Sequence, residues 1–79
     1  MQVEIYLYAT LKRFMPQNIA GPGARVDVAE GTTIGEVLSL LKVPPESIKL
    51  IFLNGVHAGG DEILKDGDRV GVFPPVGGG

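Results

Sequence analysis

The strongest constraint on the fold of this chain is one well-marked helix among segments that alternate like strands. Thr33 is followed three residues later by Glu36, the spacing of a capping box that starts a helix. Apolar side chains then recur at helical spacing, at Ile34, Val37, Leu38 and Leu41. Pro44-Pro45 ends the pattern, and Gly35 weakens the helix by about 1 kcal/mol relative to alanine. Because a single helix covers one face of a sheet, the sequence favours a two-layer α+β domain.

Five other segments show the alternation or the short apolar run of strands: residues 3–9, 25–29, 48–53, 56–58 and 69–73. Asn54-Gly55 joins the third to the fourth and is a strong hairpin signal. We expect strands one and two to pair antiparallel, and the sheet is mixed if strands one and five run side by side. The order β-β-α-β-β-β makes the β-grasp arrangement the natural candidate, with a mixed sheet of about four to five strands crossed by one main helix.

The connecting segments carry weaker signals. Thr10 to Met15 is predicted as a short helix capped by Thr10, and the turn-rich residues 16–24 are predicted as a loop. Residues 62–65 are expected to form a turn or a single helical turn. Gly59-Gly60 is interpreted as a connector.

Composition excludes several kinds of site. The chain has 79 residues, no cysteine, no tryptophan and one histidine, so disulfides, thiolate metal centres and cysteine nucleophiles are absent. We expect no metal and no bound cofactor. A net charge of −2 argues against nucleic acid or an anionic membrane as the main partner. No apolar run approaches the length of a membrane span and the first residues do not resemble a signal peptide, so a cytoplasmic location is expected.

The side chains offer little for catalysis. Asp61 and Glu62, and likewise Asp66 and Asp68, form acidic pairs in segments where such residues favour turn geometry. His57 stands alone in a short strand, with no signature of a nucleophile and its base around it. The structural interpretation is preferred for all of these residues, and the chain is expected not to be an enzyme.

The parity of the strands predicts an apolar patch instead. Leu50 and Phe52 fall on the face opposite to Ile51, and Phe73 has the opposite parity to Val70 and Val72. With Tyr6 or Tyr8 they would form an exposed patch, which marks an interaction site. The alternative is that the loop of residues 16–24 covers the patch. Lys49 and Arg69 lie in strands that can neighbour the last one, so recognition of an acidic partner is a further hypothesis.

The end of the chain has no obvious structural purpose. Three terminal glycines, Gly77, Gly78 and Gly79, add entropy cost without burial, which is typical of a disordered end. Because glycine has no side chain, this end of the chain could also pass through a narrow channel. Pro74-Pro75 is stiff and points the tail away from the sheet, and residues 76–79 reach about 13 Å at roughly 3.3 Å each. We therefore expect a domain over residues 1–75 and a flexible tail over residues 76–79, with the Gly79 carboxylate as the reactive group.

These motifs together resemble a known family. The ending Phe-Pro-Pro-Val-x-Gly-Gly after Asp-Gly-Asp-x-Val is similar to the ubiquitin-like sulfur carriers, which include the small subunit of molybdopterin synthase and the carrier of thiamine biosynthesis. The resemblance covers the whole chain. It includes residues 7–11, 30–34, 53–55 and 64–70.

The resemblance implies a mechanism and partners. An E1-like enzyme would use ATP to adenylate the carboxylate of Gly79, and a sulfur donor would displace AMP to leave a thiocarboxylate. A sulfur-accepting synthase, either the large subunit of molybdopterin synthase or thiazole synthase, would then receive the tail. The family docks through its exposed sheet face, which implies partner-binding roles for Leu50, Phe52, Phe73, Pro74, Pro75 and Val76.

Several functions share this architecture. Phe-Pro-Pro-Val and residues 8–15 favour the molybdopterin branch, whereas residues 54–62 depart from its typical pattern. A thiamine-thiazole carrier, a ubiquitin-like protein modifier joined through Gly79 and a plain interaction domain remain as alternatives.

Overall fold

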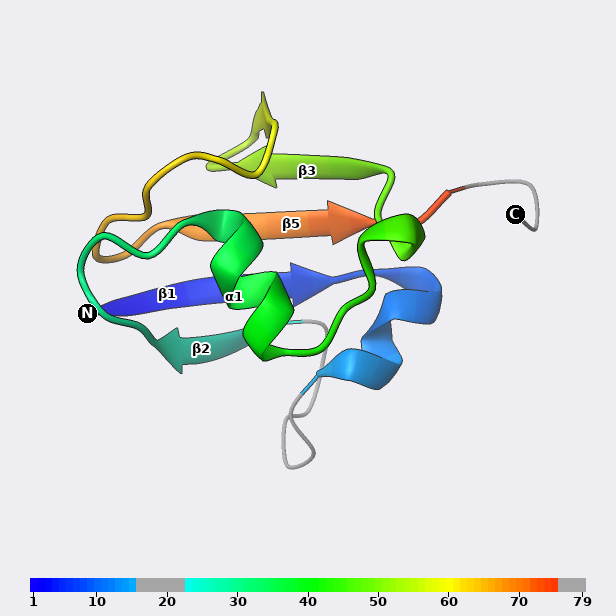
Figure 1. The fold of residues 1–79 in the computed structure, drawn as a ribbon, viewed down its shortest axis with the longest axis horizontal. Helices are drawn as coiled ribbons and strands as arrows, with labels where there is room; N and C mark the ends of the chain where they lie inside the picture. The colour runs from blue at the N-terminus through cyan, green and yellow to red at the C-terminus, as the bar shows by residue number, and fades with distance from the viewer. Residues whose placement is uncertain (16–22, 76–79) are drawn as a thin grey trace.

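The computed structural model describes residues 1–15 and 23–75 of the chain (Figure 1). Its elements in chain order are β1 (Gln2–Leu7), the 3₁₀ helix η1 (Ala9–Phe14), β2 (Gly23–Asp27), α1 (Ile34–Leu40), the 3₁₀ helix η2 (Pro45–Ser47), β3 (Leu50–Leu53), β4 (Val56–Ala58) and β5 (Arg69–Phe73). The predicted α+β class is confirmed. Within the described residues, no helix has the length and apolarity needed to cross a membrane.

The five strands form one mixed sheet in the order β2-β1-β5-β3-β4. β1 pairs parallel with β5 in its centre, whereas the other three pairs are antiparallel, including β1 with β2 as predicted. The Asn54-Gly55 hairpin is confirmed, because both residues have positive φ and join β3 to β4 in register. This is the β-grasp arrangement that the element order suggested.

Helix α1 lies across one face of the sheet, as Figure 1 shows, and the core fills the space between the two layers. The predicted capping box is present: the Glu36 amide donates to Thr33 Oγ1 and the Thr33 amide donates to Glu36 Oε1, at 3.2 and 2.9 Å. The helix buries Ile34, Val37 and Leu38, while Leu41, the expected fourth apolar position, is its half-buried C-cap. The opposite face of the sheet has no helix on it within the described residues.

Two predicted short helices differ from the structure. The segment after β1 is a 3₁₀ helix from Ala9 whose N-cap is Tyr8, so Thr10 is not a cap. Three residues per turn suit this sequence, because Leu11, which is buried, and Phe14, which packs on the core, are three residues apart. Residues 62–65 form no helical turn.

Residues 62–65 are extended because they pair with the segment before α1. Ile63 forms an isolated bridge with Thr33, and the Leu64 amide donates to the Thr32 carbonyl at 2.8 Å. Leu64 is thereby buried in the core. The third strand is also shorter than predicted: Ile48 is the C-cap of η2, its amide donates to the Pro45 carbonyl, and β3 begins at Leu50.

Candidate functional site

The sheet face opposite α1 collects the side chains that the parity of the strands directs away from the core. Phe73 is paired in register with Leu50, and Phe52 lies opposite both Gly71 and His57. The three apolar residues predicted to form a patch therefore do gather on one face. Leu50 is 40% exposed, and Phe52 and Phe73 are half-buried.

Aromatic rings cross this face from one strand to the next. The Tyr8 and Phe73 rings stack with centroids 4.5 Å apart, and Phe52 meets Phe73 edge to face at 5.8 Å. Tyr6 stacks on Tyr8 at 6.4 Å, and His57 meets Phe52 at 5.9 Å. We call these five side chains the aromatic row. Aromatic pairs at such distances hold one another in place, so the row is a preformed apolar surface.

A hollow opens within the row at Gly71. This residue lies between Tyr6 and Phe52 in the register of the sheet, and it has no side chain to fill the space between the rings. The hollow measures about 420 Å³ and is lined by Tyr6, Tyr8, Phe52, Gly55, Arg69, Gly71 and Phe73. It is large enough to accept an apolar side chain of a partner.

Charged residues border the row at the Arg69 end of β5. The Glu4 carboxylate lies 3.2 Å from Nε of Arg69 and 3.9 Å from Nε of Arg25. Both arginine side chains are about 70% exposed and retain donors that face solvent. Arg69 lies at the border of the row, whereas Lys49 lines a different hollow, described below; recognition of an acidic partner by either residue stays a hypothesis.

The chain leaves the sheet beside the row. β5 ends at Phe73, whose carbonyl accepts the Lys49 amide at 2.8 Å, and the half-buried Pro74 and Pro75 follow. Figure 1 shows this exit at the end of the sheet away from the N-terminus. The predicted tail residues Val76, Gly77, Gly78 and Gly79 lie outside the described residues. So do residues 16–22 of the loop 16–24 that was considered as a cover for the patch, whereas its last two residues belong to β2.

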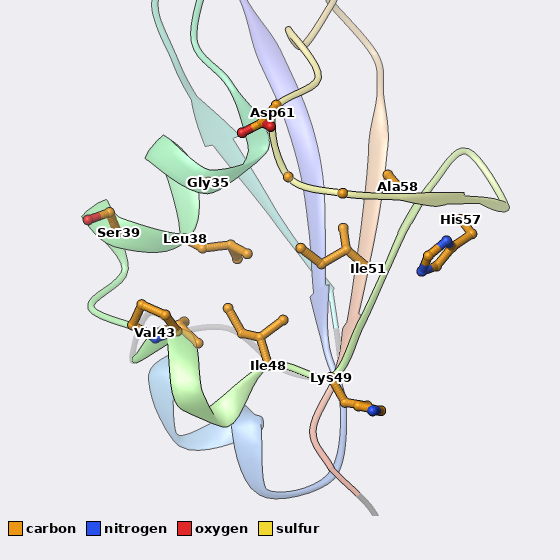
Figure 2. A pocket seen from close by; sticks show the side chains of 13 residues that line it. Gly35, Leu38, Ser39, Val43, Ile48, Lys49, Ile51, His57, Ala58 and Asp61 are labelled. Carbon is orange, nitrogen blue, oxygen red and sulfur yellow. The ribbon is translucent and has the colours of Figure 1, made fainter.

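The sequence did not predict a second hollow, which lies between α1, η2 and the β3–β4 hairpin (Figure 2). It measures about 540 Å³, and Leu38, Val43, Ile48 and Ile51 point into it. Gly35 and residues 59–61 also line it. Gly35 permits a close approach, since its amide donates to the Gly60 carbonyl at 2.9 Å and an added Cβ would lie 3.3 Å from that oxygen. The Gly59-Gly60 pair, which was interpreted as a connector, is the sequence feature that could have indicated this hollow.

Glu62 holds the loop beside this second hollow. Its carboxylate accepts the Gly59 and Gly60 amides at 2.9 and 2.8 Å. These backbone hydrogen bonds, with a smaller contribution from His57, hold the pKa of the Glu62 carboxyl below its ordinary value of 4.5. Glu62 therefore stabilises the loop of residues 59–61.

The other acidic residues also bond the backbone. Asp66 accepts the Gln2 amide at 2.8 Å, and Asp68 accepts the Lys65 amide at 2.8 Å and the Asn54 side-chain amide at 3.0 Å. Within residues 1–15 and 23–75, no group of three His, Cys, Asp or Glu side chains is placed to hold a metal ion. The aromatic row next to the chain exit is accordingly the candidate site.

Comparison with known proteins identifies the family. The family model of the ThiS family matches residues 15–79. SAMP1 from Haloferax volcanii is 28% identical over all of both chains, with a TM-score of 0.73. A protein of Pyrococcus furiosus assigned as molybdopterin converting factor subunit 1 is 26% identical, with a TM-score of 0.71 over 95% of this chain and 98% of that one.

A third structure supports the fold alone. The complex of subunits 1 and 2 of molybdopterin-converting factor from Helicobacter pylori contains a chain that is 22% identical over the whole of both, with a TM-score of 0.63. No curated protein matches. The resemblance inferred from the sequence motifs is confirmed, and the chain belongs to the ThiS family of ubiquitin-like β-grasp proteins.

Proposed function

We propose that this chain is a sulfur carrier whose C-terminal Gly79 becomes a thiocarboxylate and delivers sulfur to molybdopterin biosynthesis. The observation that carries the proposal is the position of the chain exit. Phe73 belongs to the aromatic row and is also the last residue of β5, so a partner that docks on the row lies beside the start of the tail. Residues 76–79 span about 13 Å when extended at roughly 3.3 Å each, enough to enter a partner's active site.

The proposed chemistry needs no side chain of this protein. A carboxylate oxygen of Gly79 attacks the α-phosphorus of ATP in an E1-like enzyme, and pyrophosphate leaves. A sulfide-type nucleophile then attacks the carbonyl carbon of the acyl adenylate, and AMP departs with the bonding oxygen. Gly77 and Gly78, which have no side chains, can pass a narrow channel. The carrier itself binds no cofactor in this scheme.

Partner recognition is assigned to the surface around the exit. Leu50, Phe52 and Phe73 supply the apolar contact, and Pro74, Pro75 and Val76 direct the tail. The hollow at Gly71 accepts an apolar side chain, while the exposed Arg69 favours acidic groups at its border. The partners are the activating enzyme and a sulfur-accepting synthase subunit. The similarity to the Pyrococcus furiosus protein assigned as subunit 1 of molybdopterin converting factor supports the second.

Intact-mass spectrometry tests the proposal. The chain is incubated with an E1-like enzyme, ATP and sulfide, and the expected result is a mass gain equal to the difference between sulfur and oxygen at Gly79. The variant that lacks Gly78 and Gly79 is the control and should not gain mass. No adenylate and no mass gain with several such enzymes would contradict the proposal.

A second candidate function is protein modification through an isopeptide bond from Gly79 to lysines of targets. The similarity to the Haloferax volcanii modifier SAMP1 over the whole chain favours it. A tagged chain expressed in cells would then give bands of higher mass on a blot, and the bands would disappear when Gly78 and Gly79 are deleted. A tagged chain that yields no conjugates would contradict the modifier function but not the carrier function. Reconstitution with a molybdopterin synthase large subunit or a thiazole synthase would separate the two carrier branches.

A further inference from the structure

Among residues 1–15 and 23–75 the sheet ends at β2 on one side, and no strand of this part of the chain pairs with the outer edge of β2. The Met1 amine donates to the Val28 carbonyl at 3.1 Å and the Val28 amide donates to the Met1 carbonyl at 2.9 Å. Hydrogen-bonded and non-bonded pairs alternate along an antiparallel ladder, so Val26 and Ala24 also bond β1. The peptide groups of Arg25 and Asp27 therefore point away from the sheet.

The side chains at these two positions carry opposite charge. Arg25 and Asp27 are exposed, two residues apart and on the face opposite α1, whereas Ala24 and Val26 face the core. Arg25 makes one long contact with Glu4, at 3.9 Å. An exposed strand edge usually carries residues that discourage pairing. Here the two charges are complementary to those of a second β2 that is related by a two-fold rotation.

Only certain registers are possible when β2 meets another β2 around a two-fold axis. The outward peptide groups of the two copies must face each other, so Arg25 lies opposite Arg25, Asp27 or Gly23 of the second copy, or Asp27 lies opposite Asp27. Arg25 opposite Arg25 and Asp27 opposite Asp27 bring like charges together, which destabilises a cross-strand pair. Arg25 opposite Asp27 places opposite charges together twice, once on each side of an axis through Val26.

We propose that β2 pairs antiparallel with β2 of a second copy of this chain, in the register that places Arg25 opposite Asp27. Two hydrogen-bonded pairs form across the axis, and Val26 meets its own copy on the side of the sheet that faces the core. The two five-stranded sheets become one continuous sheet. Because β2 has five residues, far fewer than the roughly 20–30 residues a side of a standard interface, the dimer is weak and forms at high protein concentration.

The other border of the sheet does not offer this match. β4 has three residues, and Leu53 pairs with Val56 beside the two-residue turn. That pair is hydrogen-bonded in a hairpin of this type, so His57 alone directs its peptide groups outward. The dimer is also compatible with the proposed sulfur carrier, because β1 separates β2 from β5 and the chain exit beside it.

Sedimentation of the full chain from micromolar to millimolar concentration tests the proposal. The wild-type mass should rise from 8.3 kDa toward twice that value, while Arg25→Asp and Asp27→Arg should each stay monomeric because like charges then meet twice. The double variant Arg25→Asp/Asp27→Arg should associate again, and so should an equimolar mixture of the two single variants. Lys49→Glu is an exposed site just before β3, which β1 and β5 separate from β2; it changes the net charge as much as Arg25→Asp and should dimerise like wild type.

Circular dichroism verifies that each variant is folded. As an independent measurement on the wild type, the NMR signals of the Arg25 and Asp27 amides should shift with concentration and their hydrogen exchange should slow. A wild-type chain that stays monomeric throughout, single variants that associate as well as wild type, or a mixture that does not associate would each overturn the proposal.

Discussion

Adding a side chain at Gly71 should separate stability from partner binding. A Cβ at this position would lie 3.6 Å from the Tyr8 ring and 4.0 Å from the Phe73 ring, which are ordinary contact distances. Glycine in a strand interior costs roughly 0.5–1 kcal/mol relative to alanine, so Gly71→Ala should stabilise the fold by about that amount. For a domain of this size, the melting temperature should then rise by roughly 2–8 °C.

The same position should behave oppositely in binding. Gly71→Val places a branched side chain in the hollow of about 420 Å³, where we place an apolar side chain of the partner. We expect affinity for the sulfur-accepting synthase subunit to fall by about tenfold or more, which is ~1.4 kcal/mol, while the valine remains compatible with the strand. Calorimetric titration of wild type, Gly71→Ala and Gly71→Val measures the binding.

Gly59→Ala is the matched control, because a Cβ there meets nothing within 4 Å and Gly59 does not line the hollow at Gly71. It should leave binding unchanged. A Gly71→Val protein that is folded and binds like wild type would refute the assignment of the hollow. A Gly71→Ala protein that melts below wild type would refute the reasoning on stability.

Three further outcomes follow from the described contacts. Replacing Thr33 by alanine removes the capping box with Glu36 and should cost about 1 kcal/mol, measured by urea unfolding. Because the pKa of Glu62 is lowered, its carboxylate stabilises the fold at pH values above the ordinary pKa of 4.5. This contribution is lost as the pH falls through the lower pKa of the folded state. Glu62→Gln should remove that part of the acid dependence of the melting temperature. Deleting Gly78 and Gly79 should abolish the mass gain and leave the melting temperature unchanged, because the buried core extends from Val3 to Val72; a clearly lower value would contradict this.

Local signals in the sequence predicted the elements that local contacts determine. The capping box of Thr33 and Glu36 involves two residues three positions apart, and the Asn54-Gly55 turn is complete within four residues. The bridge from Ile63 to Thr33 joins distant segments and has no local pattern, so the segment 62–65 was interpreted as a turn. Thr10 was wrongly taken as a cap because the 3₁₀ helix begins one residue earlier.

The candidate site was predictable to the extent that it depends on strand parity. Alternation placed Leu50, Phe52 and Phe73 on the outward face, and the register confirms that they gather there. It gave no information on the parallel pairing of β1 with β5, which stacks Tyr8 on Phe73 and leaves the hollow at Gly71. The roles of these residues in binding, and of the residues 76–79, stay predictions.

The parallel pairing of β1 with β5 also has a consequence for folding kinetics. The Gln2 amide bonds the Asp66 side chain across 64 positions, and the two central strands are the first and the last elements of the described chain. Contacts between such distant segments slow folding, because the chain loses the entropy of closing the loop before the core contacts form and stabilise it. During synthesis, Ile5 and Leu7 have no β5 to pair with until residues 69–73 have been made. The nascent chain should therefore remain open, with its apolar strands accessible to chaperones, until the strand that carries the tail is in place.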